Sequence, residues 1–430
     1  METTIIKYSS RNTFLKQAPS LFEEINYGCL GLAKEAGALY ADIDILIEKQ
    51  DAINWIALCE LHFPDTYWQV IRHQGVIYLR AYFPDHSYLE IDLIFEARVK
   101  GIQFVDVSYL LDLSKPGADG WKRIPEQEYL TYKCLFLRLN GLSPKQIIET
   151  IQPKGNLFVE TGPILRMIQS SDLKGLSRWL DQKMNKIEKE LPNQWFHKLV
   201  RRLSQFKDKG KKLPPMISFS GVDGAGKSTL LDSFHELLEK KYRRRVVRLR
   251  HRPGLLPILS VWRYGKNKAH QRAKEGLPRQ GNNQSTLSTT IRFTYYYLDY
   301  LLGYLIKVLP LRLKGNIILY DRYYFDFIAD PRRTNLSNGA SIFRKLYFFV
   351  PKVRANFLLY APSDIILSRK KELSAEDIDE LTDSYLSLFS SLSSRYREQS
   401  YQAIENIQIE ETQKKLEAKW IDLNKKLNFY

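Results

Sequence analysis

The sequence has little cysteine, no long uninterrupted apolar run and fewer acidic than basic residues. Its three cysteines are odd in number and widely spaced in 430 residues: Cys29, Cys59 and Cys134. This excludes a disulfide framework and a zinc-binding pattern, and it is typical of reduced thiols in the cytosol. The most apolar long stretch, 293–310, contains Asp299 and Lys307, which predicts a buried or amphipathic helix rather than a membrane span. Because the first residues also lack a signal-peptide pattern, we expect a cytoplasmic protein.

The deficit of acidic residues leaves a net charge of +17. The excess is concentrated between Arg201 and Arg252, where fifteen Lys and Arg accompany five Asp and Glu. Such a stretch favours an anionic partner. No recognition-helix or RNA-binding signature is present, so we expect no specific binding of nucleic acid. Peripheral association with an anionic membrane surface stays open, as does the simpler reading of a phosphate-handling enzyme with a charged linker.

The most informative motif that is present is Gly221-Val-Asp-Gly-Ala-Gly-Lys227-Ser228. It fits the phosphate-binding loop pattern, and a predicted strand at 216–220 and a predicted helix at 229–241 flank it. In such a loop the backbone N–H groups surround the phosphates, Lys227 reaches the β and γ oxygens, and Ser228 can hold Mg²⁺. The residues expected to bind ATP are Gly221, Asp223, Gly224, Ala225, Gly226, Lys227, Ser228 and Thr229.

Two features make this loop resemble that of thymidylate kinases. Asp223 lies inside it, and a predicted strand at 316–320 runs into Asp321-Arg322-Tyr323. The resemblance covers residues 213–430 and implies an α/β P-loop kinase domain with a parallel sheet and helices on both faces. A carboxylate at the end of a parallel strand lies where such sheets bind ligands, so Asp321 is expected to hold Mg²⁺ or to accept a proton. Arg322 is expected to clamp an acceptor phosphate, although a salt-bridged strand end is the alternative.

A lid arginine and the acceptor site complete the resemblance. Arg369 follows a predicted strand at 355–361 and matches the arginine that approaches the transferring phosphoryl group; a solvated helix face is the alternative. Where thymidylate kinases have Thr-Arg-Glu-Pro-Gly, this chain has Arg250-His251-Arg252-Pro253-Gly254. We therefore expect a more basic pocket, for a nucleoside monophosphate or for a sugar or polyol phosphate. The residues expected to contact this acceptor are Arg250, Arg252, Arg292 and Tyr323.

The first two hundred residues carry a second pattern of carboxylates. Asp42 and Asp44 lie two apart on a predicted strand, and Asp92 lies on another at 88–95. Three carboxylates on adjacent strands can bind two divalent cations. With Gly28-Cys29 upstream, the pattern resembles polymerase-β-type nucleotidyltransferases, although Cys29 departs from their Gly-Gly or Gly-Ser. The resemblance implies an α+β domain with a mixed sheet and metal ligands at Asp42, Asp44 and Asp92; a solvated strand face is the alternative.

These patterns predict a nucleotidyltransferase-like domain at 1–141, a helical connector and basic linker at 142–212, and a kinase domain at 213–430. The expected function is ATP- and Mg²⁺-dependent phosphoryl transfer to a small anionic acceptor. Nucleotidyl transfer by the first domain is open as a second activity. The alternatives are a kinase with an N-terminal binding module and a nucleotide-gated regulatory or defence protein. A homodimer is also open.

Overall fold

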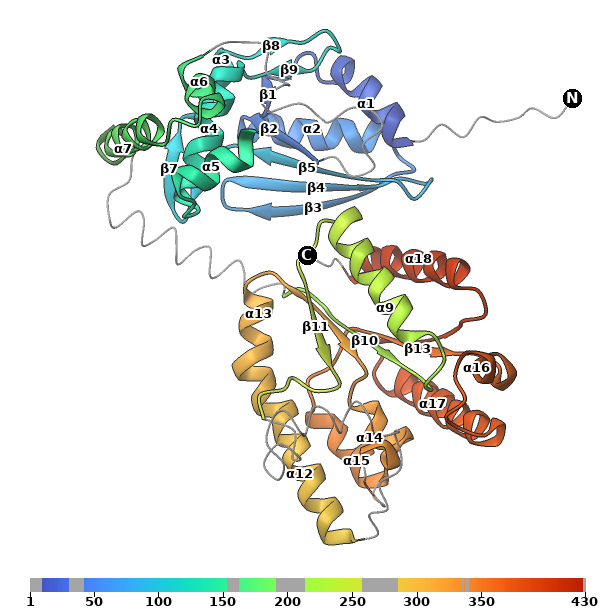
Figure 1. The fold of residues 1–430 in the computed structure, drawn as a ribbon. Helices are drawn as coiled ribbons and strands as arrows, with labels where there is room; N and C mark the ends of the chain where they lie inside the picture. Colours follow the sequence, from blue (N-terminus) through green and yellow to red (C-terminus); the bar gives the residue numbers. More distant parts are fainter. Residues whose placement is uncertain are drawn as a thin grey trace, which may run out of the picture. The chain divides into compact units, whose positions relative to one another are not determined.

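The computed structural model describes residues 10–30, 42–152, 162–190, 213–256, 285–334, 336 and 340–427. The chain divides into two compact units, Met1–Lys211 and Lys212–Tyr430. Each unit has its own central sheet (Figure 1). Each also has its own hydrophobic cores. Most of the predicted basic linker, at 191–212, lies outside the described residues.

The N-terminal unit is built on a seven-stranded sheet with the order β3-β4-β5-β2-β1-β9-β8. β2 pairs in parallel with β5, whereas β1–β2, β3–β4 and β4–β5 are antiparallel, so the predicted mixed sheet is confirmed. A separate hairpin joins β6 and β7. The strands are β1 (Tyr27–Cys29), β2 (Asp42–Ile47), β3 (Tyr67–His73), β4 (Val76–Tyr82), β5 (Tyr88–Ile94), β6 (Ala97–Val99), β7 (Ile102–Val105), β8 (Lys115–Pro116) and β9 (Lys122–Arg123).

Aspartate and isoleucine alternate along the first part of β2, so the two faces of the sheet differ in polarity. Ile43, Ile45 and Ile47 are buried in one core that also contains residues of α1 (Ser10–Leu21) and α2 (Lys49–His62). Because successive side chains of a strand point to opposite faces, Asp42 and Asp44 lie on the other face. The sheet therefore presents carboxylates on the face away from this core.

A second core joins the helices that follow the sheet. It contains buried residues from each of α3 (Val107–Asp112), α4 (Glu126–Leu139), α5 (Pro144–Ile151), α6 (Pro163–Gln169) and α7 (Leu173–Glu190). α5 begins with a capping box in which Ser143 and Gln146 satisfy each other's backbone N–H groups. α5, α6 and α7 lie in the segment predicted to be a connector, and their packing on α4 makes them part of the N-terminal unit's core.

The C-terminal unit is built on a five-stranded sheet with the order β11-β12-β10-β13-β14. All its neighbouring strands pair in parallel, as predicted for an α/β unit. The strands are β10 (Met216–Ser220), β11 (Val246–Arg250), β12 (Ile317–Asp321), β13 (Ala355–Tyr360) and β14 (Ser400–Glu405). The chain moves from central β10 to β11 on one side and later to β13 on the other, so the topological switch lies beside the end of β10.

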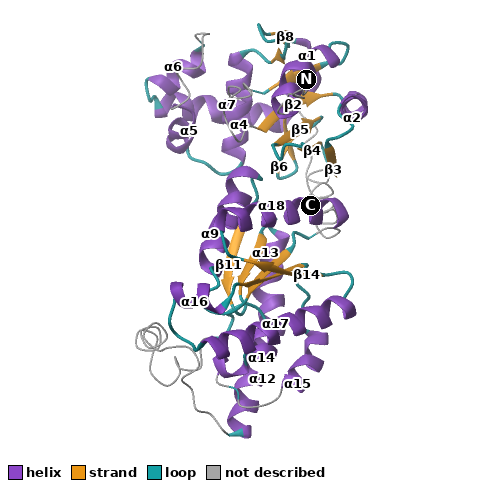
Figure 2. Ribbon diagram, turned by 90° about the vertical axis from the view of Figure 1, so that its right-hand side faces the viewer, coloured by secondary structure: helices purple, strands orange, loops and turns teal. Residues whose placement is uncertain are grey.

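Helices cover both faces of this sheet, as Figure 2 shows for α14 and α18. One core contains residues of α12, α14 and α17, while on the other face Phe219 and Phe357 of the strands meet Phe234 of α9, which contacts Trp420 of α18. The helices are α9 (Lys227–Glu236), α12 (Thr286–Gly303), α13 (Leu309–Leu313), α14 (Phe325–Ala329), α15 (Ala340–Leu346), α16 (Ser363–Arg369), α17 (Ala375–Arg395) and α18 (Ile409–Leu427). Single turns of π-helix extend α9 and α12, at η2 (Leu237–Lys241) and η3 (Tyr304–Val308).

The apolar stretch at 293–310 falls within α12, η3 and the start of α13. Asp299 in this stretch is fully buried and Phe293 packs in the core, which agrees with a helix that lies against the sheet. Among the helices of the described ranges, none combines the length and apolar character required to cross a bilayer.

Candidate functional site

The glycine-rich loop between β10 and α9 adopts backbone angles that favour glycine at three positions. Gly221, Gly224 and Gly226 have φ angles of 137°, 89° and 81°. A Cβ atom at Gly221 would lie 2.0 Å from the Leu359 carbonyl oxygen, and one at Gly226 would lie 2.3 Å from Nδ2 of Asn406. The loop thus passes close to its neighbours and delivers the chain to the first turn of α9, whose free N–H groups favour an anion.

Lys227 begins α9 and folds back over the loop. Its side chain is 7% exposed, its Nζ donates to the Val222 carbonyl oxygen at 2.6 Å and lies 3.7 Å from Oδ1 of Asp223. Burial, followed by the nearby charge of Arg322, lowers the pKa of Lys227 to about 7. The ammonium group is held by bonds within its own loop that phosphate oxygens can replace.

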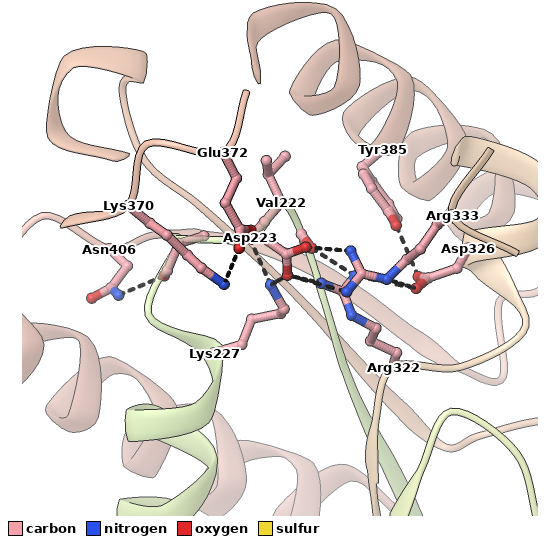
Figure 3. A network of polar contacts seen from close by, with 12 residues as sticks. Val222, Asp223, Lys227, Arg322, Asp326, Arg333, Lys370, Glu372, Tyr385 and Asn406 are labelled. Carbon is pink, nitrogen blue, oxygen red and sulfur yellow. Dashed lines mark hydrogen bonds and ion pairs between the residues drawn. The ribbon is translucent and has the colours of Figure 1, made fainter. Parts of the chain in front are cut away.

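Asp223 places a carboxylate in the same loop, and two arginines neutralise it (Figure 3). Arg322 donates to Oδ1 at 2.5 Å, and Arg333 donates to both carboxylate oxygens. Burial alone would raise the pKa of Asp223, but the charges of Arg322, Lys227 and Arg333 hold it well below its usual value. The carboxylate is therefore ionised and surrounded by cations.

Arg322 follows β12 with a φ of 73°, an uncommon conformation for a residue with a side chain. Its guanidinium is buried and donates to the Gly221 carbonyl oxygen at 3.0 Å and to Oδ2 of Asp326 at 3.1 Å. Asp326 in turn accepts from the Tyr385 hydroxyl at 2.8 Å. Although burial disfavours its charge, Asp326 raises the pKa of Arg322. Arg322 thus makes the ion pairs of the salt-bridged alternative and links the loop to Asp326, while its role as an acceptor clamp stays a prediction.

Ser228 and Asp321 are the predicted Mg²⁺ ligands of this unit. Asp321 ends β12 beside Phe219 of β10, and Ser228 lies exposed in the first turn of α9. With the described residues, neither side chain makes a hydrogen bond or an ion pair. Hydroxyl and carboxylate oxygens are the ligands that Mg²⁺ prefers, so this pair fits the ion. Thr229, also exposed, makes no side-chain contact of this kind either.

Arg252, predicted to bind the acceptor, is paired inside the unit. Its Nη1 donates to Asp299 at 2.9 Å, and its guanidinium lies 4.5 Å from the centre of the Tyr296 ring. Asp299 also accepts from three successive backbone N–H groups, those of Gly254, Leu255 and Leu256. Asp299 thereby fixes the segment around Pro253-Gly254 to α12. Arg252, one of the cations expected in the basic pocket, is paired with this buried carboxylate.

The other predicted acceptor residues are scattered. Tyr323 is 1% exposed and donates to the Pro351 carbonyl oxygen at 2.6 Å, so it belongs to the core. Arg292 donates to the Ser288 hydroxyl on its own helix at 3.3 Å. Arg250 ends β11 with an exposed side chain. His251 follows it, and neither of its buried ring nitrogens has a hydrogen-bond partner in the described structure.

Arg369, the predicted lid arginine, ends α16 next to the loop. It donates to the carbonyl oxygens of Asn406 at 3.1 Å and Ile407 at 2.8 Å. Asn406 is fully buried and donates from Nδ2 to the carbonyl oxygen of Ala225 at 2.8 Å. Arg369 thus lies beside the phosphate-binding loop, where it orders the chain that follows β14.

The structure adds residues that no motif indicates, above all Asp326, Arg333, Tyr385 and Asn406. Arg333 and Asn406 contact the loop from distant parts of the chain, whereas Asp326 pairs with Arg322 four residues before it and accepts from Tyr385. The only local signal was positional, since Asn406 follows the end of a parallel strand, where ligands bind in such sheets. That strand, β14, was not predicted.

The carboxylates predicted to bind metal ions in the N-terminal unit lie on one face of its sheet. Asp44 on β2 is in register with Asp92 on β5, and Asp42 is in register with Glu90. In the described ranges, no group of three or more His, Cys, Asp or Glu residues is arranged to hold a metal ion. Burial, and then Asp44, raise the pKa of Asp92 well above its usual value. The predicted ligation of two metal ions by Asp42, Asp44 and Asp92 therefore stays a prediction, since carboxylates gathered on one face repel one another whenever no cation lies between them.

No protein-family model matches this chain, and no curated protein matches it at a significant level.

Proposed function

We propose that the C-terminal unit is a P-loop kinase that transfers the γ-phosphoryl group of ATP to a small acceptor, as its resemblance to thymidylate kinases implies. The observation that carries the proposal is the loop itself: a glycine-dependent turn at the end of a central parallel strand, closed by a buried lysine at the start of a helix. Phosphoryl transfer depends mainly on positioning and charge stabilisation, and this arrangement supplies both.

The roles of the residues follow from their positions. The loop backbone and Lys227 bind the phosphates of ATP, and Lys227 exchanges its bond to Val222 for phosphate oxygens. Ser228 and Asp321 would hold Mg²⁺, which supplies neutralisation of phosphate charge when bound. Arg369 lies beside the loop and can turn from its carbonyl partners toward the transferring group.

The acceptor binds at the carboxyl ends of β11 and β12, beside the loop. Arg250 has an exposed side chain at this edge, while Arg252 and Arg322 are paired with buried carboxylates. A small anionic compound such as a nucleoside monophosphate, or a sugar or polyol phosphate, fits this mixture of charges. We do not extend the proposal to nucleotidyl transfer by the N-terminal unit, which stays a prediction, because no group of three or more His, Cys, Asp or Glu residues within the described ranges is arranged to hold a metal ion.

The proposal is tested with the Lys227→Ala variant. We expect ADP release, stimulated by one member of a panel of nucleoside monophosphates, sugar phosphates and polyol phosphates, to fall at least about a hundredfold in the variant, because a preorganised charge is lost. The exposed Lys314 provides the matched control, Lys314→Ala, which keeps full activity.

Wild-type protein that hydrolyses ATP slowly, without stimulation by any acceptor, and changes its oligomeric state with nucleotide would instead support a nucleotide-gated switch. Full acceptor-stimulated turnover in the Lys227→Ala variant would contradict any role of this loop in catalysis.

A further inference from the structure

The phosphate-binding loop lies in a cluster of five charged residues. The cations of this loop charge cluster are Lys227, Arg322 and Arg333, and its carboxylates are Asp223 and Asp326. All five are buried or mostly buried, with Arg333 the most exposed at 19%. With all five groups ionised, the cluster carries one net positive charge in a place of low dielectric, where each charge acts strongly on its neighbours.

Asp223 is the unusual member, because it places a negative charge in a loop built for anions. An unneutralised carboxylate there would repel the phosphates of a nucleotide. Arg333 donates to both carboxylate oxygens of Asp223. Arg322 donates to one of them and also to the Gly221 carbonyl oxygen and to Asp326. Arg333 is thus the cation that makes the most hydrogen bonds to Asp223.

We propose that Arg333 is a positioning residue of the phosphate-binding loop: it neutralises Asp223 and holds it against Arg322, so that the loop accepts a nucleoside triphosphate. This inference rests on the proposed function of the loop. Arg333 comes from a short 3₁₀ turn, η4 (Pro331–Thr334), far along the chain from the loop. Without its charge the cluster has no net positive charge left for the ligand.

The two-pronged contact explains why the residue is an arginine. A guanidinium matches both oxygens of a carboxylate, whereas a lysine supplies only a point charge. Arg332 provides a matched control, because its side chain is exposed and makes no hydrogen bond or ion pair with the described residues.

The test is a double-mutant cycle on the full chain, with the affinity for ATP–Mg²⁺ measured by calorimetry. We expect Arg333→Gln to weaken binding at least about tenfold, because Asp223 is then left facing the phosphates. In an Asp223→Asn background the same substitution changes affinity by less than about threefold, since the loop carboxylate is gone and the remaining one, Asp326, keeps its closer partner Arg322. Arg333→Lys recovers part of the loss, and Arg332→Gln binds as the wild type does.

An equal loss from Arg333→Gln in both backgrounds would show that Arg333 contacts the ligand directly, which overturns the proposal. Unchanged affinity in the wild-type background would also overturn it. Thermal unfolding of each variant checks that it is folded. If Arg333→Gln does not fold, the cycle is carried out with Arg333→Lys, and its loss of affinity for ATP–Mg²⁺ must again be smaller in the Asp223→Asn background. Wild-type protein that does not bind ATP–Mg²⁺ would reject the proposed function itself, independently of this cycle.

Discussion

At the scale of single residues, the N-terminal unit places two carboxyl groups opposite each other on neighbouring parallel strands. Asp92 lies opposite Asp44, and Oδ1 of Asp92 is buried without a hydrogen-bond partner in the described structure. Arg80, the basic residue of the neighbouring strand β4, is paired with Glu90. The raised pKa of Asp92 follows from burial first and from Asp44 second.

This pKa has a consequence for stability. A carboxyl group whose pKa is raised by folding contributes most below its unfolded value, and that contribution is lost as the pH rises through the folded value. We expect Asp92→Asn, which removes the titration, to be more stable than the wild type at pH 8 by on the order of 1 kcal/mol, with the difference vanishing near pH 4. Urea unfolding of both proteins across this pH range measures it. A difference independent of pH, or a less stable variant at pH 8, would contradict the inference.

At the scale of elements, the neighbouring strand shapes the phosphate-binding loop. Gly221 has a φ of 137°, and its missing side chain is what lets β10 end beside the Leu359 carbonyl of β13. Gly315 also has a positive φ, 89°, but a Cβ atom there would meet nothing within 4 Å. Adding a side chain at Gly315 therefore costs only the strain of its backbone conformation. Adding one at Gly221 costs that strain and also a clash with β13.

We expect Gly315→Ala to destabilise the C-terminal unit by about 1 kcal/mol, the cost of a left-handed conformation alone. Gly221→Ala should cost several times more, roughly 3 kcal/mol or above, because the backbone of β13 must also move. Denaturant unfolding followed by tryptophan fluorescence measures both. Similar losses in the two variants would mean that the packing against β13 is not what requires glycine.

At the scale of the whole molecule, the chain consists of two compact units with separate sheets and cores. The helices α5, α6 and α7 extend the first unit, while the phosphate-binding loop and its charge cluster belong entirely to the second. Units of this kind are expected to unfold as separate cooperative bodies.

We therefore expect two calorimetric transitions. ATP–Mg²⁺ should raise the melting temperature of only one of them, because a ligand stabilises the unit that binds it. Gly221→Ala should lower the temperature of that same transition. A single transition that shifts as a whole with nucleotide would contradict independent units.

The sequence by itself determined the features that depend on neighbouring residues. The loop motif and the strands at 216–220 and 42–47 were predictable, because glycine spacing and apolar periodicity act over a few residues. The parallel and mixed sheets were expected only from the family resemblances that these motifs carry. Only the tertiary structure decided which side chains meet. Arg333 reaches Asp223 across 110 positions of the chain, and Tyr323, adjacent to Arg322, turns into the core. Such pairings depend on how helices and strands pack, which no local pattern encodes, and they link Arg322, the predicted arginine clamp, to the carboxylate of the loop.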